Sequence, residues 1–208
     1  MYRCQPKARR LQPLAFLALA LLLLAPHPAA SRPAFSDTDV THLRRGAIVF
    51  SADLPPGPHK DGGMGGTALA LLQADREAVW QTLVDFPGHA GLFPKIKESA
   101  VIEQQANLTL VSYRVAMGLL SFRFFIKNYV NAPAHTLRWE LDQSRHNDLF
   151  LDHWGYWKVE PWGEGTLVTY AMGGHTTLPA FLTRGAGREG ILLAVKALKE
   201  RVEHRQAL

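Results

Sequence analysis

The feature that most limits the fold of this chain is an alternation of apolar and polar residues between residues 99 and 172. A period of two is typical of β-strands with one buried face. Turn residues interrupt the alternation, and the connections are too short for the crossover helix that parallel strands require. The pattern therefore predicts an antiparallel meander over Ser99–Gln104, Leu108–Met117, Phe122–Val130, Thr136–Asp142, Asp148–Glu160 and Thr166–Met172.

Two short strands and two helical segments precede the meander. Residues 46–52 and 67–74 predict strands, and the Pro- and Gly-rich stretch between them predicts a long loop. Asp75 is a favourable N-cap, and apolar residues recur behind it at helical spacing until Pro87. Residues 89–93 predict a second, short helical segment.

The C-terminal part of the chain returns to a helical pattern. We expect Thr177 to cap this helix and Pro179 to lie in its first turn. An apolar stripe at i, i+4, i+7 and i+11 indicates an amphipathic helix that packs on the sheet, and it consists of Ile191, Val195, Leu198 and Val202. The charged residues expected to point outward are Lys196, Lys199, Glu200 and Arg201.

Three segments resemble sequences of the START-like (SRPBCC) superfamily. Residues 74–86 (ADREAVWQTLVDF) are similar to its first-helix signature, residues 93–101 to the start of its second strand, and residues 155–170 to its last hairpin. Within the superfamily the chain most resembles the polyketide cyclase/dehydrase and coenzyme-Q-binding branch, over about residues 46–202. The resemblance implies an α+β helix-grip fold, in which a curved antiparallel sheet wraps around a long C-terminal helix and two short helices follow the first strands. We place this START-like domain at residues 46–205.

The resemblance also implies a cavity between the sheet and the C-terminal helix, which related domains use for lipids, quinones, sterols or polyketides. The side chains expected to line it are Tyr113, Val115, Met117, Phe122, Phe124, Trp139, Trp154, Tyr156, Ile191, Val195 and Leu198. Such apolar and aromatic walls suit a hydrophobic ligand with one polar end. The alternative is a solid core that the same side chains fill.

Two functions follow from the resemblance. One is a non-enzymatic binder or carrier of a hydrophobic small molecule, such as a lipid, a quinone or a polyketide-like compound. The other is a cyclase- or dehydratase-type enzyme that acts in the same cavity. We favour the carrier, assign no catalytic residue and expect no cofactor. A protein-interaction role, as in ribosome-associated relatives, is a third interpretation, against which the export signal described below argues.

The densest group of titratable residues consists of His146, Asp148, Asp152 and His153. Asp152 and His153 are neighbours in a predicted strand, so their side chains should point to opposite faces. Because a zinc site needs convergent ligands, we expect no metal site. An enzyme would need His153 or Asp152 together with Tyr156 as general acid or base. We favour surface ion pairs of this group with Arg138 or Arg145 instead.

Residues 1–31 have the pattern of a secretory signal peptide: a basic start, an apolar run from Leu11 to Ala25, and small residues at its end. The apolar run is shorter than the roughly 20 residues that a membrane-spanning helix needs, and an uncleaved anchor is the alternative. We expect residues 32–45 to form a flexible leader. The mature protein should then be periplasmic or extracellular, without a membrane span.

Removal of this segment changes the charge of the protein. Residues 1–31 hold 4 of the 23 basic and none of the 18 acidic side chains, which leaves 19 basic and 18 acidic residues and a net charge of +1. Nucleic-acid binding depends on clustered basic residues, so we expect no nucleic-acid partner. The only cysteine, Cys4, is removed as well, which excludes disulfides and thiolate chemistry in the mature chain.

The signal pattern predicts that the exported protein begins near residues 30–32. N-terminal sequencing of the protein from the extracytoplasmic fraction checks this. A cytosolic protein that retains Met1 would contradict the prediction.

Overall fold

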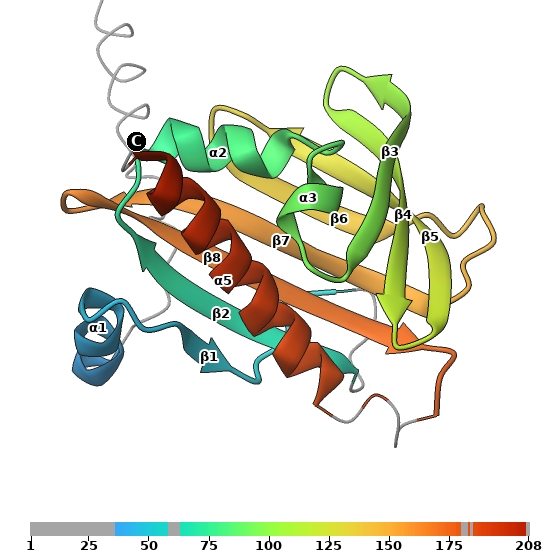
Figure 1. Cartoon of the computed structure of the whole chain (residues 1–208), viewed down its shortest axis with the longest axis horizontal. Coiled ribbons are helices and arrows are strands. Elements are labelled where there is room, and N and C mark those ends of the chain that lie inside the picture. Colours follow the sequence, from blue (N-terminus) through green and yellow to red (C-terminus); the bar gives the residue numbers. More distant parts are fainter. Residues whose placement is uncertain (1–35, 58–62, 180–182, 184, 207–208) are drawn as a thin grey trace, which may run out of the picture. The chain divides into compact units, whose positions relative to one another are not determined.

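The computed structural model describes residues 36–57, 63–179, 183 and 185–206. The predicted signal peptide, residues 1–31, lies outside the described residues. Within the described part, a curved antiparallel sheet carries a long C-terminal helix across one face, and two short helices follow the second strand (Figure 1). This arrangement is the predicted α+β helix-grip fold.

The sheet has the strand order β1-β2-β8-β7-β6-β5-β4-β3, and every neighbouring pair is antiparallel. The predicted meander is confirmed as β3 to β8, and β1 and β2 extend the sheet beside β8. The strands are β1 Val49–Ser51, β2 Met64–Leu72, β3 Ile96–Gln105, β4 Leu108–Met117, β5 Leu120–Asn131, β6 Thr136–Leu141, β7 Phe150–Trp162 and β8 Gly165–Thr176.

Helices α2 (Arg76–Val84) and α3 (His89–Leu92) follow β2, as predicted. Asp75 caps α2, because its Oδ1 accepts the backbone N–H groups of Glu77 and Ala78 at 2.9 and 3.1 Å. These are donors that the helix itself leaves unpaired. The cap therefore defines where the chain leaves β2 and turns over the sheet.

Residues 32–45, predicted to form a flexible leader, include helix α1 (Asp37–Arg44). Ser36 Oγ accepts the N–H of Asp39 at 3.1 Å, and Asp39 Oδ2 accepts the N–H of Ser36 at 3.1 Å, which makes a reciprocal capping box. Leu43 is 2% exposed. The sequence prediction missed this helix because one capping box and one buried leucine give no apolar period.

The long C-terminal helix is α5 (Ala186–Gln206). It begins after the predicted cap at Thr177, whose N–H donates instead to the backbone oxygen of Leu149 at 2.9 Å. Thr177 therefore continues the pairing at the edge of β8, and the helix starts only where the chain has turned back over the sheet.

α5 lies across β2 and β8 and also contacts α2. Ile191, Val195 and Leu198, three residues of its apolar stripe, are fully buried. In the same core, β2 contributes the small side chains of Ala68 and Ala70, also buried. Small side chains on the strand let the helix approach it closely, and the apolar stripe fills the contact.

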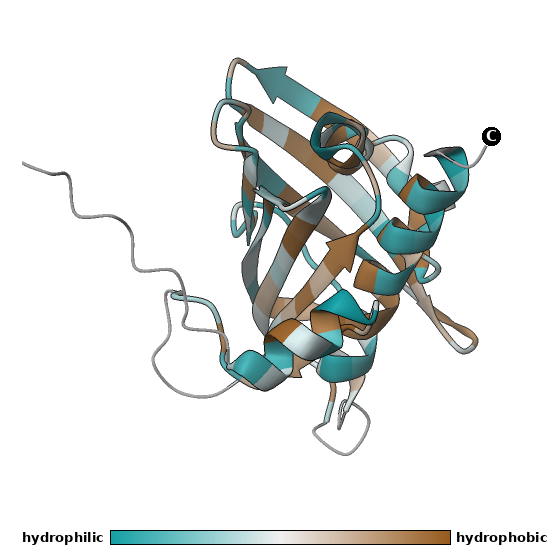
Figure 2. Cartoon of the chain, turned by 90° about the vertical axis from the view of Figure 1, so that its left-hand side faces the viewer, coloured by the Kyte–Doolittle hydropathy of each residue, from teal (hydrophilic) through white to brown (hydrophobic). Residues whose placement is uncertain are grey.

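The start of α5 meets β2 at a glycine. A Cβ on Gly187 would lie 2.7 Å from the backbone nitrogen of Gly65, closer than a side-chain carbon packs. Figure 2 shows that the side of α5 toward the sheet is hydrophobic and the opposite side hydrophilic. Among the residues described, no helix combines the length and the apolar character needed to cross a bilayer.

The charged residues of α5 divide into two groups. Lys196 and Glu200 are exposed, as predicted. Lys199 Nζ donates to the backbone oxygen of Leu71 at 3.0 Å, and Arg201 donates to a carbonyl of α3. The prediction of an outward orientation is wrong for these two, because long side chains at the flank of a docked helix reach the carbonyl groups of its neighbours.

Replacement of Val195 by aspartate should place an unpaired charge in an apolar site and lower the free energy of unfolding by several kcal/mol, on the order of the cost of burying a polar group. Lys196→Asp, at the next position but on the exposed side, is the control and should change it by about 0.5 kcal/mol or less. Urea denaturation measures both. Equal midpoints for the two variants would mean that α5 does not dock through Val195.

Candidate ligand-binding cavity

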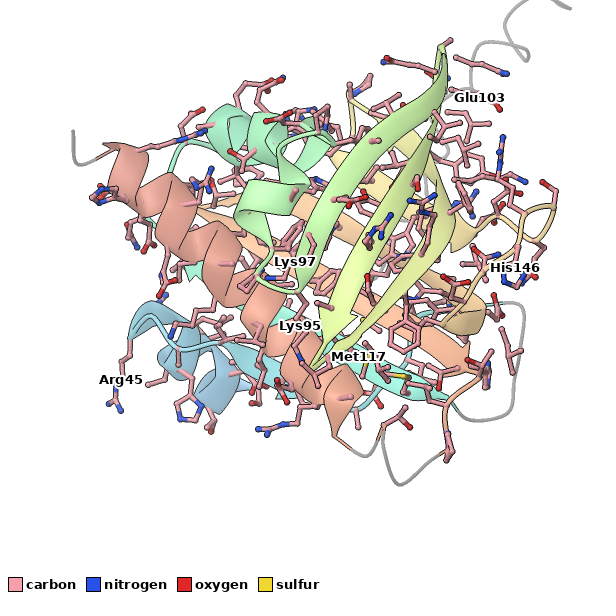
Figure 3. All side chains as sticks on the ribbon, turned by 45° about the vertical axis from the view of Figure 1, so that its right-hand side comes forward. Arg45, Lys95, Lys97, Glu103, Met117 and His146 are labelled. Atoms are coloured by element: carbon pink, nitrogen blue, oxygen red, sulfur yellow. The ribbon has the colours of Figure 1, made fainter. Side chains whose placement is uncertain are left out.

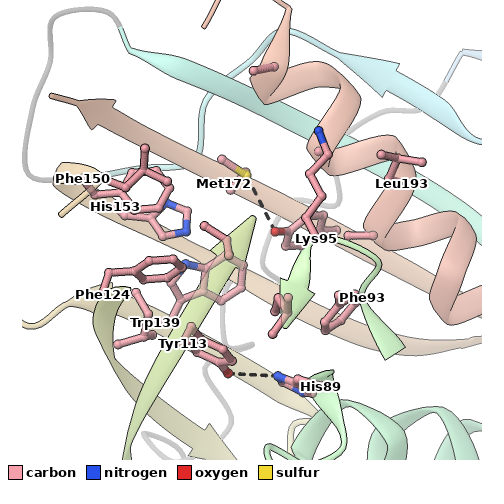
Figure 4. Close-up of a pocket in the computed structure, with 18 of the residues that line it drawn as sticks. His89, Phe93, Lys95, Tyr113, Phe124, Trp139, Phe150, His153, Met172 and Leu193 are labelled. Carbon is pink, nitrogen blue, oxygen red and sulfur yellow. Dashed lines mark hydrogen bonds between the residues drawn. The ribbon is translucent and has the colours of Figure 1, made fainter. Parts of the chain in front are cut away.

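A cavity of about 240 Å³ lies between the sheet and one flank of α5 (Figure 4). Small-molecule sites usually measure roughly 300–1,000 Å³, so this cavity suits a small ligand. Its walls come from β4 to β8, from the first residue of β2, from α3 with the start of β3, and from α5. Residues that are far apart in the sequence therefore meet around one space.

Many of the side chains in the wall are aromatic. Trp157 and Tyr170 stack with their ring centroids 3.9 Å apart, and Tyr170 also meets Trp139 at 5.5 Å. Gly155 pairs with Trp139 across β6 and β7 and makes room for its ring, since a Cβ there would lie 2.3 Å from Trp139 Cζ2. Aromatic faces of this kind favour flat, apolar ligands.

An irregularity in the pairing of β7 brings two more rings into the wall. The register of β7 against β8 shifts between Phe150 and Asp152. A bulge of this kind changes which face the following side chains point to. Phe150 and His153 are three residues apart and would face opposite sides of a regular strand. In this strand they both line the cavity and stack at 4.4 Å with 9° between their planes.

His153 is buried in the wall and makes one hydrogen bond to the part of the chain that the structure describes. Its Nδ1 donates to the backbone oxygen of Gly173 at 3.1 Å, and because a carbonyl oxygen only accepts, the proton of the neutral ring is on Nδ1. Burial lowers the pKa of His153 to about 4, since the charged form would lose its hydration. At neutral pH the ring is therefore uncharged and Nε2 carries a lone pair.

A second buried histidine connects α3 to the sheet. His89 Nε2 donates to the backbone oxygen of Leu83 at 2.9 Å, and the Tyr113 hydroxyl donates to His89 Nδ1 at 2.9 Å (Figure 4). Burial lowers the pKa of His89 to about 4 and raises the pKa of Tyr113. Both ring nitrogens of His89 therefore have hydrogen-bond partners within the protein, and the His89–Tyr113 hydrogen bond holds α3 against β4.

The described part of the cavity wall carries little charge. Among the described residues that line it, Lys95 is the one side chain with a formal charge, and its Nζ pairs with Glu189 Oε1 of α5 at 2.9 Å. The Lys95 side chain is 43% exposed. In Figure 3 Lys95 and Met117 both lie beside the first half of α5. Deeper in, the Tyr170 hydroxyl donates only to the weak acceptor Met172 Sδ, at 3.7 Å.

Five of the eleven side chains predicted to line a cavity do so, namely Tyr113, Val115, Met117, Phe124 and Trp139. They lie on β4, β5 and β6, where the alternation distinguishes the apolar face clearly. Phe122 has the same parity as Phe124 but lies outside the wall, half-buried near the turn between β4 and β5.

Trp154 and Tyr156 of β7 also lie outside the wall. Trp154 points to the other face, where its Nε1 donates to the backbone oxygen of Pro55 at 3.2 Å. The residues of β7 that face the cavity here are His153 and Trp157. Because aromatic side chains occupy both faces of this strand, hydropathy alone does not indicate which set points inward.

Ile191, Val195 and Leu198 do not line the cavity either, because they fill the core between α5 and β2. The helix residues that face the cavity are Ala186, Gly190, Leu193 and Ala194. The sequence identified the most apolar stripe of the helix correctly. Since the helix lies over β2 and β8 rather than over the middle of the sheet, a neighbouring and less apolar flank faces the cavity.

Residues of the wall that the sequence prediction missed include His89, Phe93, Trp157 and Tyr170. Trp157 and Tyr170 are paired across β7 and β8, in the hairpin that carries the family resemblance, so a signal was available for them. His89 and Phe93 lie in and just after the one-turn helix α3, where no periodic pattern marks an inward position.

Asp152 and His153 do not lie at the surface, where ion pairs with Arg138 or Arg145 were expected. Both residues are buried, with 8% and 9% of their surface exposed, while Arg138 and Arg145 pair with glutamates. His153 shares the parity of Trp157 in the regular pairing of β7 with β8, and this face of the strand lines the cavity. Within the described ranges, no three His, Cys, Asp or Glu side chains converge to hold a metal ion.

A family model described as polyketide cyclase/dehydrase and lipid transport matches residues 72–199. The matched segment is more than half of the chain and contains α2, strands β3 to β8 and most of α5. No curated protein matches the sequence.

Several solved structures share the fold at low sequence identity. A START superfamily protein from Mycobacterium smegmatis is 19% identical with a TM-score of 0.59, and the match covers 69% of this chain and 99% of that one. A STAR-related lipid transfer protein from Xanthomonas axonopodis is 16% identical, with a TM-score of 0.59 and coverage of 74% and 98%. The Zhui aromatase/cyclase from Streptomyces sp. R1128 is 16% identical, with a TM-score of 0.50 and coverage of 68% and 84%.

The buried, neutral state of His153 should make stability depend on pH. The fold holds its pKa at about 4, while an unfolded histidine has a pKa of about 6.5, so between these values the unfolded chain binds more protons. The stability that the neutral His153 allows should be fully present above about pH 6.5, and the free energy of unfolding should decrease as the pH falls toward 4. Urea midpoints between pH 7 and pH 4 check this. His153→Phe should reduce the dependence of the urea midpoint on pH and leave only the part due to His89. An unchanged pH dependence would contradict the low pKa assigned to His153.

Proposed function

The chain belongs to the polyketide cyclase/dehydrase and lipid transport family, and on this basis we propose that it binds a hydrophobic small molecule in the cavity between its sheet and α5, as a carrier rather than as an enzyme. The observation that carries the proposal is the wall of this cavity, which is largely aromatic and aliphatic over the residues described, with Lys95 partly exposed and ion-paired. The solved structures support the fold in which such a cavity forms.

The apolar surface that a ligand can bury in this cavity sets the scale of its binding free energy. Burial of apolar surface contributes about 25 cal/mol per Å², so a two-ring ligand that buries about 300 Å² gains about 7.5 kcal/mol before the entropic costs of binding. Affinity in the micromolar range corresponds to a binding free energy of about 8 kcal/mol. Because apolar burial alone falls short of this value, such a ligand would also have to stack on Trp139, Trp157 or Tyr170.

A cyclase- or dehydratase-type enzyme is the second candidate, and the observation that favours it is a histidine whose Nε2 is available to the cavity. A general base is most effective when its pKa lies near the working pH. A pKa of about 4 makes His153 a weak base at neutral pH, and His89 has both ring nitrogens engaged. These two facts support the carrier.

We further propose that the carrier works outside the cytoplasm, in the periplasm or beyond the cell. The support is the pattern of residues 1–31, with its basic start, short apolar run and small residues before the domain. Recovery of the protein in the extracytoplasmic fraction is the corresponding observation.

Narrowing the cavity should weaken binding. Ala194 lines the cavity from α5, so Ala194→Phe should fill part of the space and weaken the binding of the neutral fluorescent probe N-phenyl-1-naphthylamine about tenfold or more, equivalent to roughly 1.4 kcal/mol. Lys196→Phe adds the same ring on the exposed side of the same helix and should leave the affinity unchanged. Fluorescence titration measures all three proteins.

The wild-type result separates the proposal from its alternative. Absence of probe binding to the wild-type protein at micromolar concentrations would contradict the carrier function. A general acid or base usually contributes about 100-fold or more to a rate. If His153→Phe lowered the turnover of a bound substrate by that factor, the protein would be an enzyme and not a carrier.

A further inference from the structure

One ring nitrogen of His153 lies in the cavity wall without a hydrogen-bond partner among the residues that the structure describes. The ring of His153 is held by Phe150, stacked at 4.4 Å, and by Phe124, edge-on at 6.4 Å. Its Nδ1 proton is engaged by the backbone oxygen of Gly173. Nε2 makes no hydrogen bond to any residue that the structure describes, and the ring lies in the cavity wall (Figure 4).

The lone pair on Nε2 can only accept a hydrogen bond. A ligand that covers Nε2 without donating to it leaves an acceptor unpaired, which is costly. A ligand that donates to Nε2 is therefore favoured over one that brings a second lone pair to it. A phenol or hydroquinone hydroxyl donates in this way. A quinone carbonyl or an ether oxygen does not, because it is itself an acceptor.

Asn128 adds to the same preference. Its Nδ2 donates to the backbone oxygens of Thr109 and Ile126 at 3.2 and 3.3 Å, so the remaining polar atom of the side chain is the acceptor Oδ1. Asn128 is 3% exposed and lines the cavity. Asn128 and His153 are thus two buried polar side chains of the wall that each offer an acceptor.

The wall also disfavours anions. A carboxylate that leaves water for an apolar cavity needs a counter-ion or several donors. The one cation that the described part of the wall contains, Lys95, is ion-paired with Glu189 and 43% exposed. A ligand with an ionised carboxylate is therefore unsuited to the part of the cavity that His153 lines.

We propose that the cavity selects an uncharged ring compound that carries a hydroxyl or N–H donor, such as a phenol or a hydroquinone, and that this donor binds Nε2 of His153. The inference rests on the proposed carrier function, because it names the chemical class of the ligand in the same cavity. His153 is thereby a specificity-determining residue, and the aromatic rings beside it provide the apolar surface for the ligand's ring system.

Three compounds with the same ring system test this selectivity. At pH 7, 2-naphthol is neutral and donates a hydrogen bond, 2-methoxynaphthalene is neutral without a donor, and 2-naphthoate is an anion. By isothermal titration calorimetry we expect the wild-type protein to bind 2-naphthol at least tenfold more tightly than 2-methoxynaphthalene, with 2-naphthoate the weakest, in line with the usual cost of an unpaired buried acceptor, roughly tenfold or more.

Two variants assign the selectivity to one residue. His153→Phe keeps an aromatic ring in the wall and should bring the ratio between 2-naphthol and 2-methoxynaphthalene to within about twofold, since the acceptor is gone. His146→Phe makes the same change at a histidine that is 90% exposed, and it should keep the wild-type ratio.

Equal affinity of the wild-type protein for 2-naphthol and 2-methoxynaphthalene would overturn this selectivity and leave the carrier function standing. So would an unchanged ratio in His153→Phe. If none of the three compounds binds, the carrier function itself fails. Should His153→Phe not fold, the nitrogen-15 resonance of Nε2 in the wild-type protein decides: it should shift with 2-naphthol and not with 2-methoxynaphthalene, and equal shifts with both would refute the contact.

Discussion

The close contact between α5 and β2 is the constraint on which the rest of the structure depends. Small residues on the strand, Ala68 and Ala70, and the approach of Gly187 to Gly65 let the helix lie directly on one side of the sheet. The buried stripe around Val195 holds it there, since each fully buried side chain of this kind contributes about 1.5–3 kcal/mol. A helix held over β2 and β8 does not cover β4 to β6. The inward side chains of those strands therefore face a space instead of a packed interface.

The chemistry of that space follows from its burial. Its two histidines are kept neutral because an imidazolium would lose its hydration there. His89 uses one ring nitrogen to bind Tyr113 of β4 and the other to bind the backbone oxygen of Leu83 in α2, while His153 has one nitrogen directed to the cavity. The fold is shared by proteins named for lipid transfer and for cyclisation, so fold alone does not decide between these functions. The number, kind and protonation of the polar groups in the wall carry that decision.

Much of the fold could be predicted from the sequence, whereas the cavity could be predicted only in part. The alternation on β4 to β6 identified five lining residues, because each of those strands has one clearly apolar face. On β7 the same method pointed to Trp154 and Tyr156, since aromatic residues occupy both faces of this strand, and it missed Phe150, which a bulge brings to the same face as His153. On the C-terminal helix it selected the core stripe, because hydropathy ranks burial and does not distinguish a packed core from the wall of a cavity.

The sequence by itself determined the order of the elements, the antiparallel pairing and the amphipathic character of α5, because these depend on local periodicity and on short connections. Only the tertiary structure decided where the helix lies on the sheet, which of its flanks faces the cavity and which way His153 points. These features depend on contacts between residues that are distant in the chain, such as Gly187 with Gly65, and on the register of β7 against β8. A local pattern contains no information about either, because both are set by how two separately formed elements fit together.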